Sequence, residues 1–550
     1  KTVGLLNLIS SSGLLRASRE LIERSVAHED CSGSTCELEQ CLSQLQEKGI
    51  LTYREFSDEY RIWKGSDYDL HSAIHLAKAE FTKESTAALL RLSAEKSPIV
   101  AGRVSQESGV LRVFGQTFAG SEELESQAMC EEHLDGQIVY LTDTDLPDQL
   151  TSVKVDKPLL MTTLVSDQHL RDHALEVLAI ERVLGQADEN SVDWVAKREL
   201  AERLSVAQQQ LRVTLGAAWP LLKAGWHRCV PSRHKKVARI TTVKNISTLS
   251  GIASDAAEAT YTECPRIANE MLARRELTSQ GAKARRLLIE ALLAHPHEEN
   301  FGITGYGPER AMYEAVFAST GLHRKHGKKF QTVQPSDPAW NSVWQLINES
   351  LSAASVDRES LASIYNRLKT RPVGLKDGIL PVLAIAALQA RDEDIALYEH
   401  GSLVLKLDDA VAERLAKNPD NFSVKNCGTS SGIRSEVVEK LATKLGIAQE
   451  GATPSFLQVV RAIFKWLQDR PKFVHQTKQA LSAPAIGVRD EIFNAVQPDD
   501  MLFVALPKVF GMEPFESSTR KNARRSEEFV GELFGALEEL GGSYEQMLSN

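Results

Sequence analysis

The sequence predicts a mainly α-helical, multi-domain protein: an N-terminal winged helix, a small α/β unit, and then an extended helical body with winged-helix-like insertions. Its 550 residues correspond to about three to five domains of ordinary size. Apolar residues recur at helical spacing through most of the second half, whereas residues 98–165 contain short β-branched runs. No repeat of fixed period is present, which argues against a regular solenoid.

The composition excludes several classes of protein. Hydrophobic residues make up 42% and charged residues 25% of the chain, which is typical of folded soluble domains. The formal net charge of −10 and the pI of about 5.9 confine any contact with nucleic acid to local patches. The longest apolar run, Ile379–Leu388, is too short for a bilayer span of about 18 residues and predicts a buried helix. We therefore expect a cytoplasmic protein without membrane contact.

Changes of pattern along the chain predict six regions. They are a winged helix (1–66), a helix plus small α/β unit (67–170), a long helical hairpin and basic loop (171–245), a helical domain (246–350), a helical and winged-helix-like domain (351–450) and a C-terminal helical domain (451–550). The chain opens at Lys1 with a core-like segment, Val3–Ile9, so we expect further protein to precede it.

The first region shows the order of elements that defines a winged helix. It begins with a helix, followed by a second helix capped by Ser18 and a third capped by Thr35. Two short strands, 50–56 and 60–63, then form the wing. The third helix and the wing carry the acidic residues Glu37, Glu39, Glu47, Asp58 and Glu59. Because acidic groups repel DNA phosphates, we expect this module to pack between domains rather than to read DNA.

The α/β unit is predicted from short apolar runs. Strands are expected at Ile138–Leu141 and Leu159–Met161, and apolar residues alternate around Gly109 as in a hairpin. Residues 172–217 then have the pattern of a long helical hairpin, and residues 220–245 that of an exposed, polar and basic loop.

A Gly- and Pro-rich segment, 371–381, precedes a predicted apolar helix. We expect Asp377 or Gly378 to cap this helix and Pro381 to lie in its first turn. A hairpin over 395–405 follows, so the helix and hairpin together predict a second winged-helix-like element.

The search for a nucleotide-binding or catalytic motif finds none. His326–Lys329 contains a Gly-Lys pair but lacks the glycine and the hydroxyl residue that complete a phosphate-binding loop. Gly428–Gly432 is a flexible turn without a lysine, and HExxH is absent. The sequence therefore predicts no catalytic, cofactor-binding or metal-ligating residue.

Two groupings of metal-ligand residues are weak. Cys31, Cys36 and Cys41 are five residues apart, so their thiols diverge on a helix and are expected to be free. His71 and His75 share one face of a predicted helix, but no third ligand is evident.

Basic residues cluster in three places. The strongest cluster combines cations with an aromatic ring, a composition that suits phosphates and bases. Its candidate nucleic-acid contacts are Lys223, Trp226, Arg228, Arg233, Lys235, Lys236, Arg239 and Lys244. The other two clusters are Arg324, Lys325, Lys328 and Lys329, and Arg520, Lys521, Arg524 and Arg525. A solvated loop or a contact with an acidic neighbouring domain is the competing interpretation of each.

Three long motifs resemble those of very large bacterial ATP-binding proteins. They are Tyr53–Leu70, Gly302–Tyr313 with Thr320–Arg324, and 371–405. Such proteins are often encoded in phage-defence islands and are similar to the BREX ATPase and its relatives. The resemblance implies an N-terminal AAA+ or STAND-like P-loop domain that binds ATP and Mg, a winged helix, and a mostly helical C-terminal body. Because no P-loop lies within these residues, ATP hydrolysis carries over to none of them.

The predicted function is a non-catalytic scaffold or sensor body. It would couple its own P-loop ATPase domain, outside this chain, to defence-system proteins or nucleic acid. Two alternatives stay open: a DNA- or RNA-binding body that uses 223–244, and a metal-dependent nuclease in 98–165 built on Asp135 and Val155–Lys157. The sequence leaves open whether the protein forms oligomers.

Overall fold

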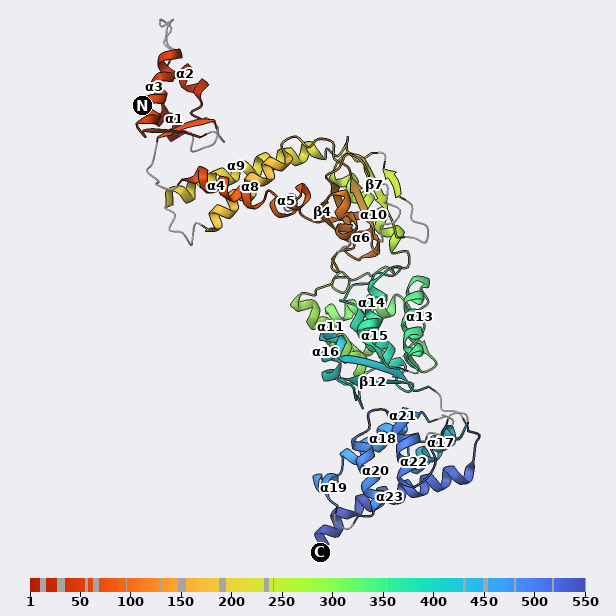
Figure 1. Ribbon diagram of the computed structural model, residues 1–550. Helices are drawn as coiled ribbons and strands as arrows, with labels where there is room; N and C mark the ends of the chain where they lie inside the picture. Colours follow the sequence, from red (N-terminus) through yellow and green to blue (C-terminus); the bar gives the residue numbers. More distant parts are fainter. Residues whose placement is uncertain are drawn as a thin grey trace. The chain divides into compact units, whose positions relative to one another are not determined.

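The computed structural model describes the chain except for residues 10–15, 27–34, 55–57, 63–68, 95, 129–130, 147–154, 187–193, 232–236, 241, 356, 429–431, 449–453, 479–480, 517–518 and 550. The side chains of residues 35–37, 194 and 546–549 are also left undescribed. The chain forms two compact units, and each is described by itself. The first unit contains residues 1–101 and 112–257, and the second contains residues 102–111 and 258–550. Most described residues are helical, which confirms that the protein is mainly α-helical (Figure 1).

The first unit begins with three helices and a two-stranded hairpin. These elements are α1 (Thr2–Ile9), α2 (Arg19–Val26), α3 (Thr35–Glu47), β1 (Leu51–Arg54) and β2 (Glu59–Ile62). The strands are antiparallel, with Leu51 opposite Ile62 and Arg54 opposite Glu59. The expectation that the opening segment is core-like is only partly met. Val3 is buried, but Leu5, Leu8 and Ile9 are each more than half exposed.

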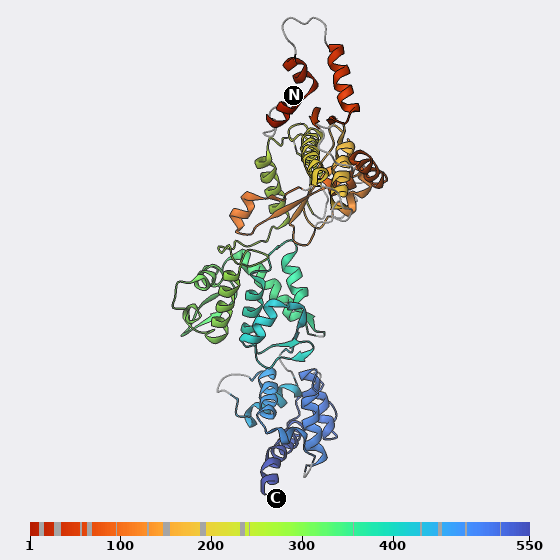
Figure 2. The ribbon, with the colours of Figure 1, turned by 90° about the vertical axis from the view of Figure 1, so that its left-hand side faces the viewer.

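A six-stranded sheet and a helical hairpin form the rest of the first unit. Its elements are α4 (Leu70–Glu80), α5 (Thr86–Ser93), β3 (Ile99–Val100), β4 (Val113–Ala119), η2 (Ser121–Glu123), α7 (Leu124–Ala128), β5 (Gly136–Leu141), β6 (Leu159–Thr162), α8 (Leu170–Gln186), α9 (Trp194–Ala218), β7 (Trp226–Cys229), β8 (Val237–Ile240) and most of α10 (Ile246–Thr260). The strand order follows the chain, from β3 to β8. Strands β4, β5 and β6 are parallel, and the outer pairs are antiparallel. The predicted hairpin helices α8 and α9 lie side by side (Figures 1 and 2).

Two details differ from the sequence prediction, the first in the first unit and the second in the second unit. Residues 220–245 are not a loop throughout, because β7 and β8 extend the sheet. Residues 102–108 form the helix α6 (Gly102–Ser108) instead of one arm of a hairpin. Gly109 follows it with a φ of +74°, and an added Cβ would lie 2.0 Å from the Ile267 carbonyl oxygen. Glycine is therefore required there.

The second unit is an α+β body with two hydrophobic cores. Its remaining elements are α11 (Ser279–Ala294), η4 (Glu299–Gly302), α12 (Pro308–Tyr313), the π-helix η5 (Glu314–Ala318), β9 (His323–His326), β10 (Lys329–Thr332), α13 (Pro338–Ala353), β11 (Glu359–Ser360), α14 (Leu361–Lys369), α15 (Leu380–Ala390), β12 (Ile395–Glu399), β13 (Ser402–Leu403), α16 (Asp409–Lys417), η6 (Pro419–Asn421), β14 (Phe422–Asn426), α17 (Ile433–Lys444), α18 (Phe456–Gln468), α19 (Lys472–Gln476), α20 (Ala483–Phe493), α21 (Pro498–Asp500), the π-helix η7 (Met501–Ala505), α22 (Leu506–Val509) and α23 (Ala523–Ser549).

Strand β12 joins the two cores of this unit. Ile395 and Leu397 belong to the core that contains α11–α16, whereas Ala396 and Tyr398 belong to the core that contains α17–α23. This assignment follows from the period of two in a strand, which sends successive side chains to opposite faces. In Figure 1, β12 lies between these two groups of helices.

The predicted helix and hairpin after residue 371 are present, but their surroundings differ from a simple wing. Strand β14 pairs with β12, and β11 pairs with β14, so the sheet has the order β11-β14-β12-β13. Helix α15 contains Pro381 in its first turn, as predicted, but its N-cap is Ile379 and no side chain caps it. Gly378 instead allows the backbone to pass close to the Leu272 and Arg274 carbonyl oxygens.

Candidate functional site

A cleft of about 850 Å³ lies in the first unit. It is built from the end of α5, the segment that enters β3, strands β4 and β5, and helices α8, α9 and α10. Its apolar walls include Leu92, Leu211, Leu215, Ile246 and Leu249. Polar and charged side chains also line the cleft, among them Glu181, Gln208 and Arg212, and the most unusual of these groups is the ammonium of Lys96.

Lys96 lies over aromatic rings instead of beside a carboxylate. Its Nζ atom is 4.0 Å from the ring centroid of Tyr140 and 5.5 Å from that of Phe118. Among the described residues it forms no ion pair or hydrogen bond, and its contacts of this kind are the two with these rings. Burial lowers the pKa of the Lys96 ammonium to about 8, because the charged form loses hydration. A partly buried cation of this kind favours an anionic ligand group.

The floor of the cleft is aromatic and is held by hydrogen bonds. The Tyr140 hydroxyl donates to Gln116 Oε1 at 2.6 Å, and the Trp219 indole donates to the Leu141 carbonyl oxygen at 3.0 Å. The rings of Phe118, Tyr140 and Trp219 are in mutual contact, with centroids 5.4–5.6 Å apart. Burial also raises the pKa of Tyr140 to about 12, so its hydroxyl stays neutral and is a poor general base.

A second arrangement of charges lies where β1 and β2 contact α9, also within the first unit. Arg54 pairs with Glu59 at 3.7 Å, with Glu202 at 3.1 Å, and with Glu199. Arg61 pairs with Glu59 at 2.8 Å and with Glu202 at 3.5 Å. The side chains of Arg54 and Glu59 are only 12% and 4% exposed. The network therefore fixes the hairpin to the long helix through groups that are largely removed from water.

Burial and charge act in opposite directions on this network. Burial lowers the pKa of Arg54, and repulsion by Arg61 adds to that effect. For Glu202, burial alone would raise the pKa. Hydrogen bonds from Arg54 and Arg198 and the charge of Arg61 outweigh it, so the pKa lies below its ordinary value.

The predicted nucleic-acid residues of 223–244 do not form one described surface. Lys223, Arg239 and Lys244 are exposed, and Arg228 is half-buried in β7. Arg233, Lys235 and Lys236 lie outside the described residues. Trp226 is 1% exposed and its ring contacts Tyr140, so in this conformation it belongs to the core beneath the cleft.

The residues on which the alternative prediction of a nuclease depends form contacts within the fold. Asp135 forms a buried ion pair with Arg112 at 2.9 Å and accepts a hydrogen bond from the Val113 amide. The Lys157 ammonium donates to the carbonyl oxygens of Glu131, Glu132 and Leu134. These partners give no support to a metal-bound arrangement of Asp135 and Lys157.

The weaker sequence groupings also stay apart. Cys41 is exposed and free, Cys31 lies outside the described residues, and the side chain of Cys36 is not described. His71 and His75 are exposed on α4. Within the described part of the chain, no three His, Cys, Asp or Glu side chains are grouped as metal ligands would be.

The segment Gly428–Gly432 has the Gly-x-Ser-x-Gly spacing of a nucleophile elbow. The sequence prediction of a flexible turn overlooked this match. It joins β14 to α17, as a strand–turn–helix motif does. However, β14 is antiparallel to both of its neighbours, whereas the elbow belongs to mainly parallel α/β-hydrolase sheets. Residues 429–431 lie outside the described residues, so Ser430 is assigned no role.

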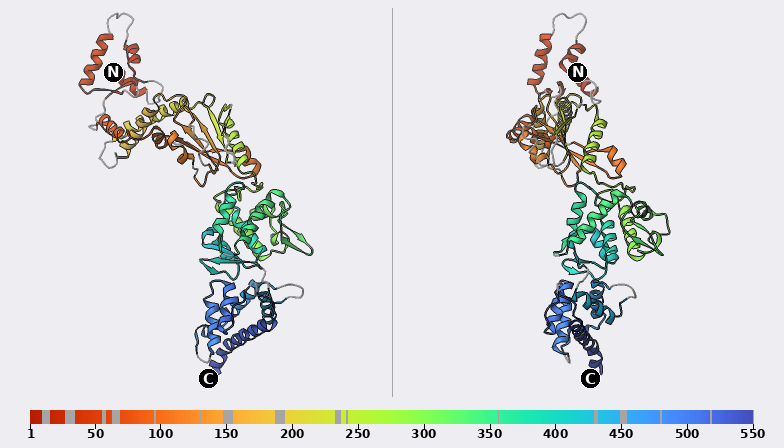
Figure 3. Two further views of the ribbon diagram at one scale, coloured as in Figure 1. Left: turned by 45° about the vertical axis from the view of Figure 1, so that its right-hand side comes forward. Right: turned by 90° about the vertical axis from the view of Figure 1, so that its right-hand side faces the viewer.

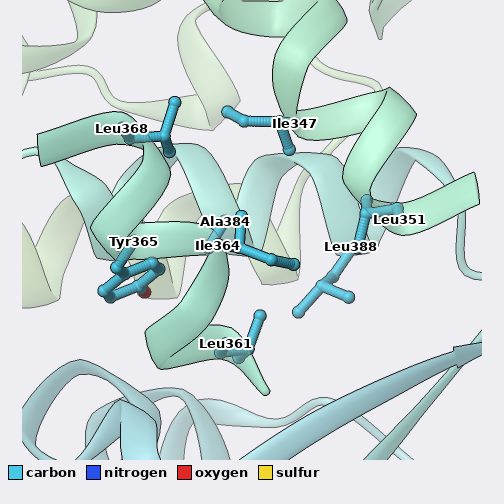
Figure 4. A pocket seen from close by; sticks show the side chains of 8 residues that line it. All are labelled: Ile347, Leu351, Leu361, Ile364, Tyr365, Leu368, Ala384 and Leu388. Carbon is cyan, nitrogen blue, oxygen red and sulfur yellow. The ribbon is translucent and has the colours of Figure 1, made fainter. Parts of the chain in front are cut away.

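A second cavity, in the core of the second unit, is too small for a ligand. Its volume is about 10 Å³, and Figure 4 shows the eight side chains that line it. Seven of them are aliphatic, and the eighth is Tyr365, whose buried hydroxyl has no hydrogen-bond partner among the described residues. Burial raises the pKa of this hydroxyl. The cavity is a packing defect of the core, not a site.

Comparison with protein-family models, with curated proteins and with solved structures gives no match for this chain. No described helix has both the length and the apolar character of a membrane span. The residues of the cleft escaped the sequence analysis because they come from distant segments, and no spacing in the sequence links them.

Proposed function

We propose that this chain is the non-catalytic scaffold and sensor body of a large bacterial P-loop ATPase, acting in the cytoplasm in defence against phage. The body binds an anionic, partly apolar ligand group in the Lys96 cleft and transmits its presence to other parts of the protein. ATP and Mg bind to the P-loop domain outside these residues, as the resemblance of the three long motifs implies.

The observation that carries the proposal is the ammonium of Lys96, which lies over aromatic rings and not beside a carboxylate, in a cleft with several apolar walls. The groups around it suit binding better than chemistry. The Tyr140 hydroxyl is neutral and donates to Gln116, and the lining contains no Cys, His or Asp. Its carboxylate, Glu181, accepts a hydrogen bond from the Gln208 side chain. A cation at the base of an apolar cleft can pair with a carboxylate, sulfonate or phosphate while the walls cover the rest of the ligand.

The first 66 residues support the scaffold role. Three helices followed by an antiparallel hairpin match the order of a winged helix. The hairpin that would serve as the wing has its arginines paired with glutamates of β2 and α9. It acts as a docking element, as expected from the acidic wing. The exposed Leu5, Leu8 and Ile9 form an apolar stripe at i, i+3 and i+4 on α1, which suits packing against a further domain.

A binding assay with an amphipathic anion tests this proposal. The probe is 1-anilinonaphthalene-8-sulfonate, followed by its fluorescence, with the neutral dye Nile red as a comparison. We expect Lys96→Met to weaken binding of the anion by about tenfold, since about 1.4 kcal/mol of charge pairing is lost, and to leave Nile red unchanged. Lys96→Arg retains the charge and should keep most of the affinity.

Two controls complete this assay. Lys223→Met removes an exposed lysine of the same unit and should leave the binding of both dyes unchanged. Mg-ATP added as a competitor should displace the anionic dye only weakly, because the chain contains no phosphate-binding loop to hold a triphosphate. Equal loss of both dyes on Lys96→Met, or tight binding of ATP by this chain, would contradict the proposal.

A further inference from the structure

The hairpin β9–β10 is an isolated two-stranded ribbon in the second unit. Its strands pair with His326 opposite Lys329 and Lys325 opposite Phe330. The connection is the two-residue turn Gly327-Lys328, in which Gly327 has a φ of +62°. A glycine in this first position is what a type II′ turn requires, so the ribbon has a tight, defined end.

The base of the ribbon is fixed by a buried histidine. His323 is 3% exposed, and its ring centroid lies 4.1 Å from that of Phe301 and 5.4 Å from that of Phe330. Its Nε2–H donates to the Pro296 carbonyl oxygen at 3.1 Å, so in the neutral ring Nδ1 accepts from the Tyr313 hydroxyl at 2.9 Å. The ribbon is therefore held at its base by contacts that a free loop would lack.

The outer part of the ribbon is densely cationic. All six residues from Arg324 to Lys329 are exposed, and the hairpin extends away from the helices of its own unit (Figure 3). The side chains of Arg324, Lys325, Lys328 and Lys329 form no ion pair or hydrogen bond with any other described residue. This charge is unneutralised although the chain as a whole is acidic, with a net charge of −10.

The alternation of the strands separates these side chains into two faces. His323, Lys325, Phe330 and Thr332 share the face that leads into the core. Arg324, His326, Lys329 and Gln331 share the other face, and the first three of these are exposed. One face thus consists only of groups that donate hydrogen bonds or carry positive charge, without an acidic residue.

We propose that this ribbon binds duplex DNA, with its polar face in the major groove and its turn against the phosphate backbone. The major groove admits a two-stranded β-ribbon, and Arg, Lys and Gln are side chains that hydrogen-bond to base edges there. Lys328 at the tip and Arg324 at the side contact phosphates, as unpaired cations do. The site is separate from the Lys96 cleft, so either proposal can fail without the other.

A salt titration of DNA binding by the whole chain tests this inference. The probe is a mixed-sequence 24-bp DNA duplex with a fluorescent label, followed by anisotropy from about 50 to about 200 mM salt. We expect the triple variant Arg324→Gln, Lys328→Gln and Lys329→Gln to bind at least tenfold more weakly at about 100 mM salt. The slope of log affinity against log salt should fall by about two, since each of the two lost phosphate contacts contributes about 0.9.

The third basic cluster provides a matched control. The variant Arg520→Gln, Lys521→Gln and Arg524→Gln removes the same charge from three exposed residues of the same unit and should change affinity less than twofold. Equal weakening by both variants would show that only net charge matters and would overturn the inference. So would absence of binding by the wild-type chain, or equal binding of the duplex and of one of its single strands. Loss of affinity for phosphatidylserine vesicles instead of the duplex would assign the ribbon to a membrane and overturn it as well.

Discussion

The two isolated hairpins of the described chain, β1–β2 and β9–β10, have strands of equal length and contrasting electrostatic surroundings. In β1–β2, Arg54 and Arg61 face three glutamates, two of which come from α9. In β9–β10, four cations extend beyond a buried histidine and meet no described carboxylate. One hairpin uses its charges to hold the fold, and the other leaves them available to a partner.

The contrast shows that basic composition alone does not indicate a binding surface. Arginines that are mostly removed from water are satisfied by carboxylates of the same chain, and losing one partner leaves the others uncompensated. Exposed lysines contribute little to folding, so their clustering needs another explanation. The three predictions below test whether the hairpins differ in this way, beginning with the largest effect.

Removing Arg54 should open the first hairpin. We expect Arg54→Ala to reduce the local stability of β1–β2 by about 3 kcal/mol, because Glu59, Glu199 and Glu202 lose their shared partner in a largely buried setting. Hydrogen–deuterium exchange of peptides that cover residues 51–62 measures the change. Arg24→Ala is the control, since its pair with Glu20 is more than 70% exposed and should contribute less than about 1 kcal/mol. Similar protection in both variants would show that the network does not hold the hairpin.

Lowering the pH should loosen the second hairpin before the first. Burial lowers the pKa of His323 below its ordinary value of about 6.5, so the folded state favours the neutral ring. Its contribution to stability is complete above about pH 6.5 and is lost as the pH falls through the lower folded pKa. Glu202 likewise has a lowered pKa, but its contribution is complete above its ordinary value of about 4.3 and is lost only below that.

Exchange measured at pH 7 and pH 5, corrected for the intrinsic rate, checks this order. Protection of residues 323–332 should be lower at pH 5 than at pH 7, whereas residues 51–62 should be protected at both pH values. His323→Phe keeps an aromatic ring among Phe301 and Phe330 but cannot titrate, so it should remove the pH dependence of the second hairpin. If protection still depended on pH in that variant, a group other than His323 would be responsible.

The same two hairpins show which parts of the fold could be predicted from the sequence and which could not. The first was predicted because apolar and polar residues alternate on both sides of a polar turn, and Ser18 and Thr35 suggested the preceding helices. The second was not expected, since His326–Lys329 contains no apolar residue and the strands depend on His323 and Phe330 at their base. When only one end of a strand is anchored in a core, apolar residues do not alternate along its full length. The sequence pattern that would predict such a strand is therefore weak.

The sequence also could not predict the burial of side chains whose neighbours lie far away along the chain. Trp226 stands among cations and suggested an exposed stacking ring, but β7 lies between β6 and β8 and turns this ring toward Tyr140. Lys96 had no distinguishing neighbour in the sequence. Its environment comes from β4, β5 and α9, which only the folded sheet brings together. By contrast, the α8–α9 pair and β5 were predicted because their apolar patterns are long or continuous.

The smallest effect is expected at the tip of the second hairpin. Lys328→Gln should change the stability of β9–β10 by less than about 0.5 kcal/mol, because the side chain is exposed and contributes no ion pair to the fold. Exchange of residues 323–332 in the free chain should match that of the wild type. A clear loss of protection would mean that the cation is structural, which would remove the difference between the two hairpins. An unchanged fold with weakened DNA binding would instead separate the two roles of charge at a single residue.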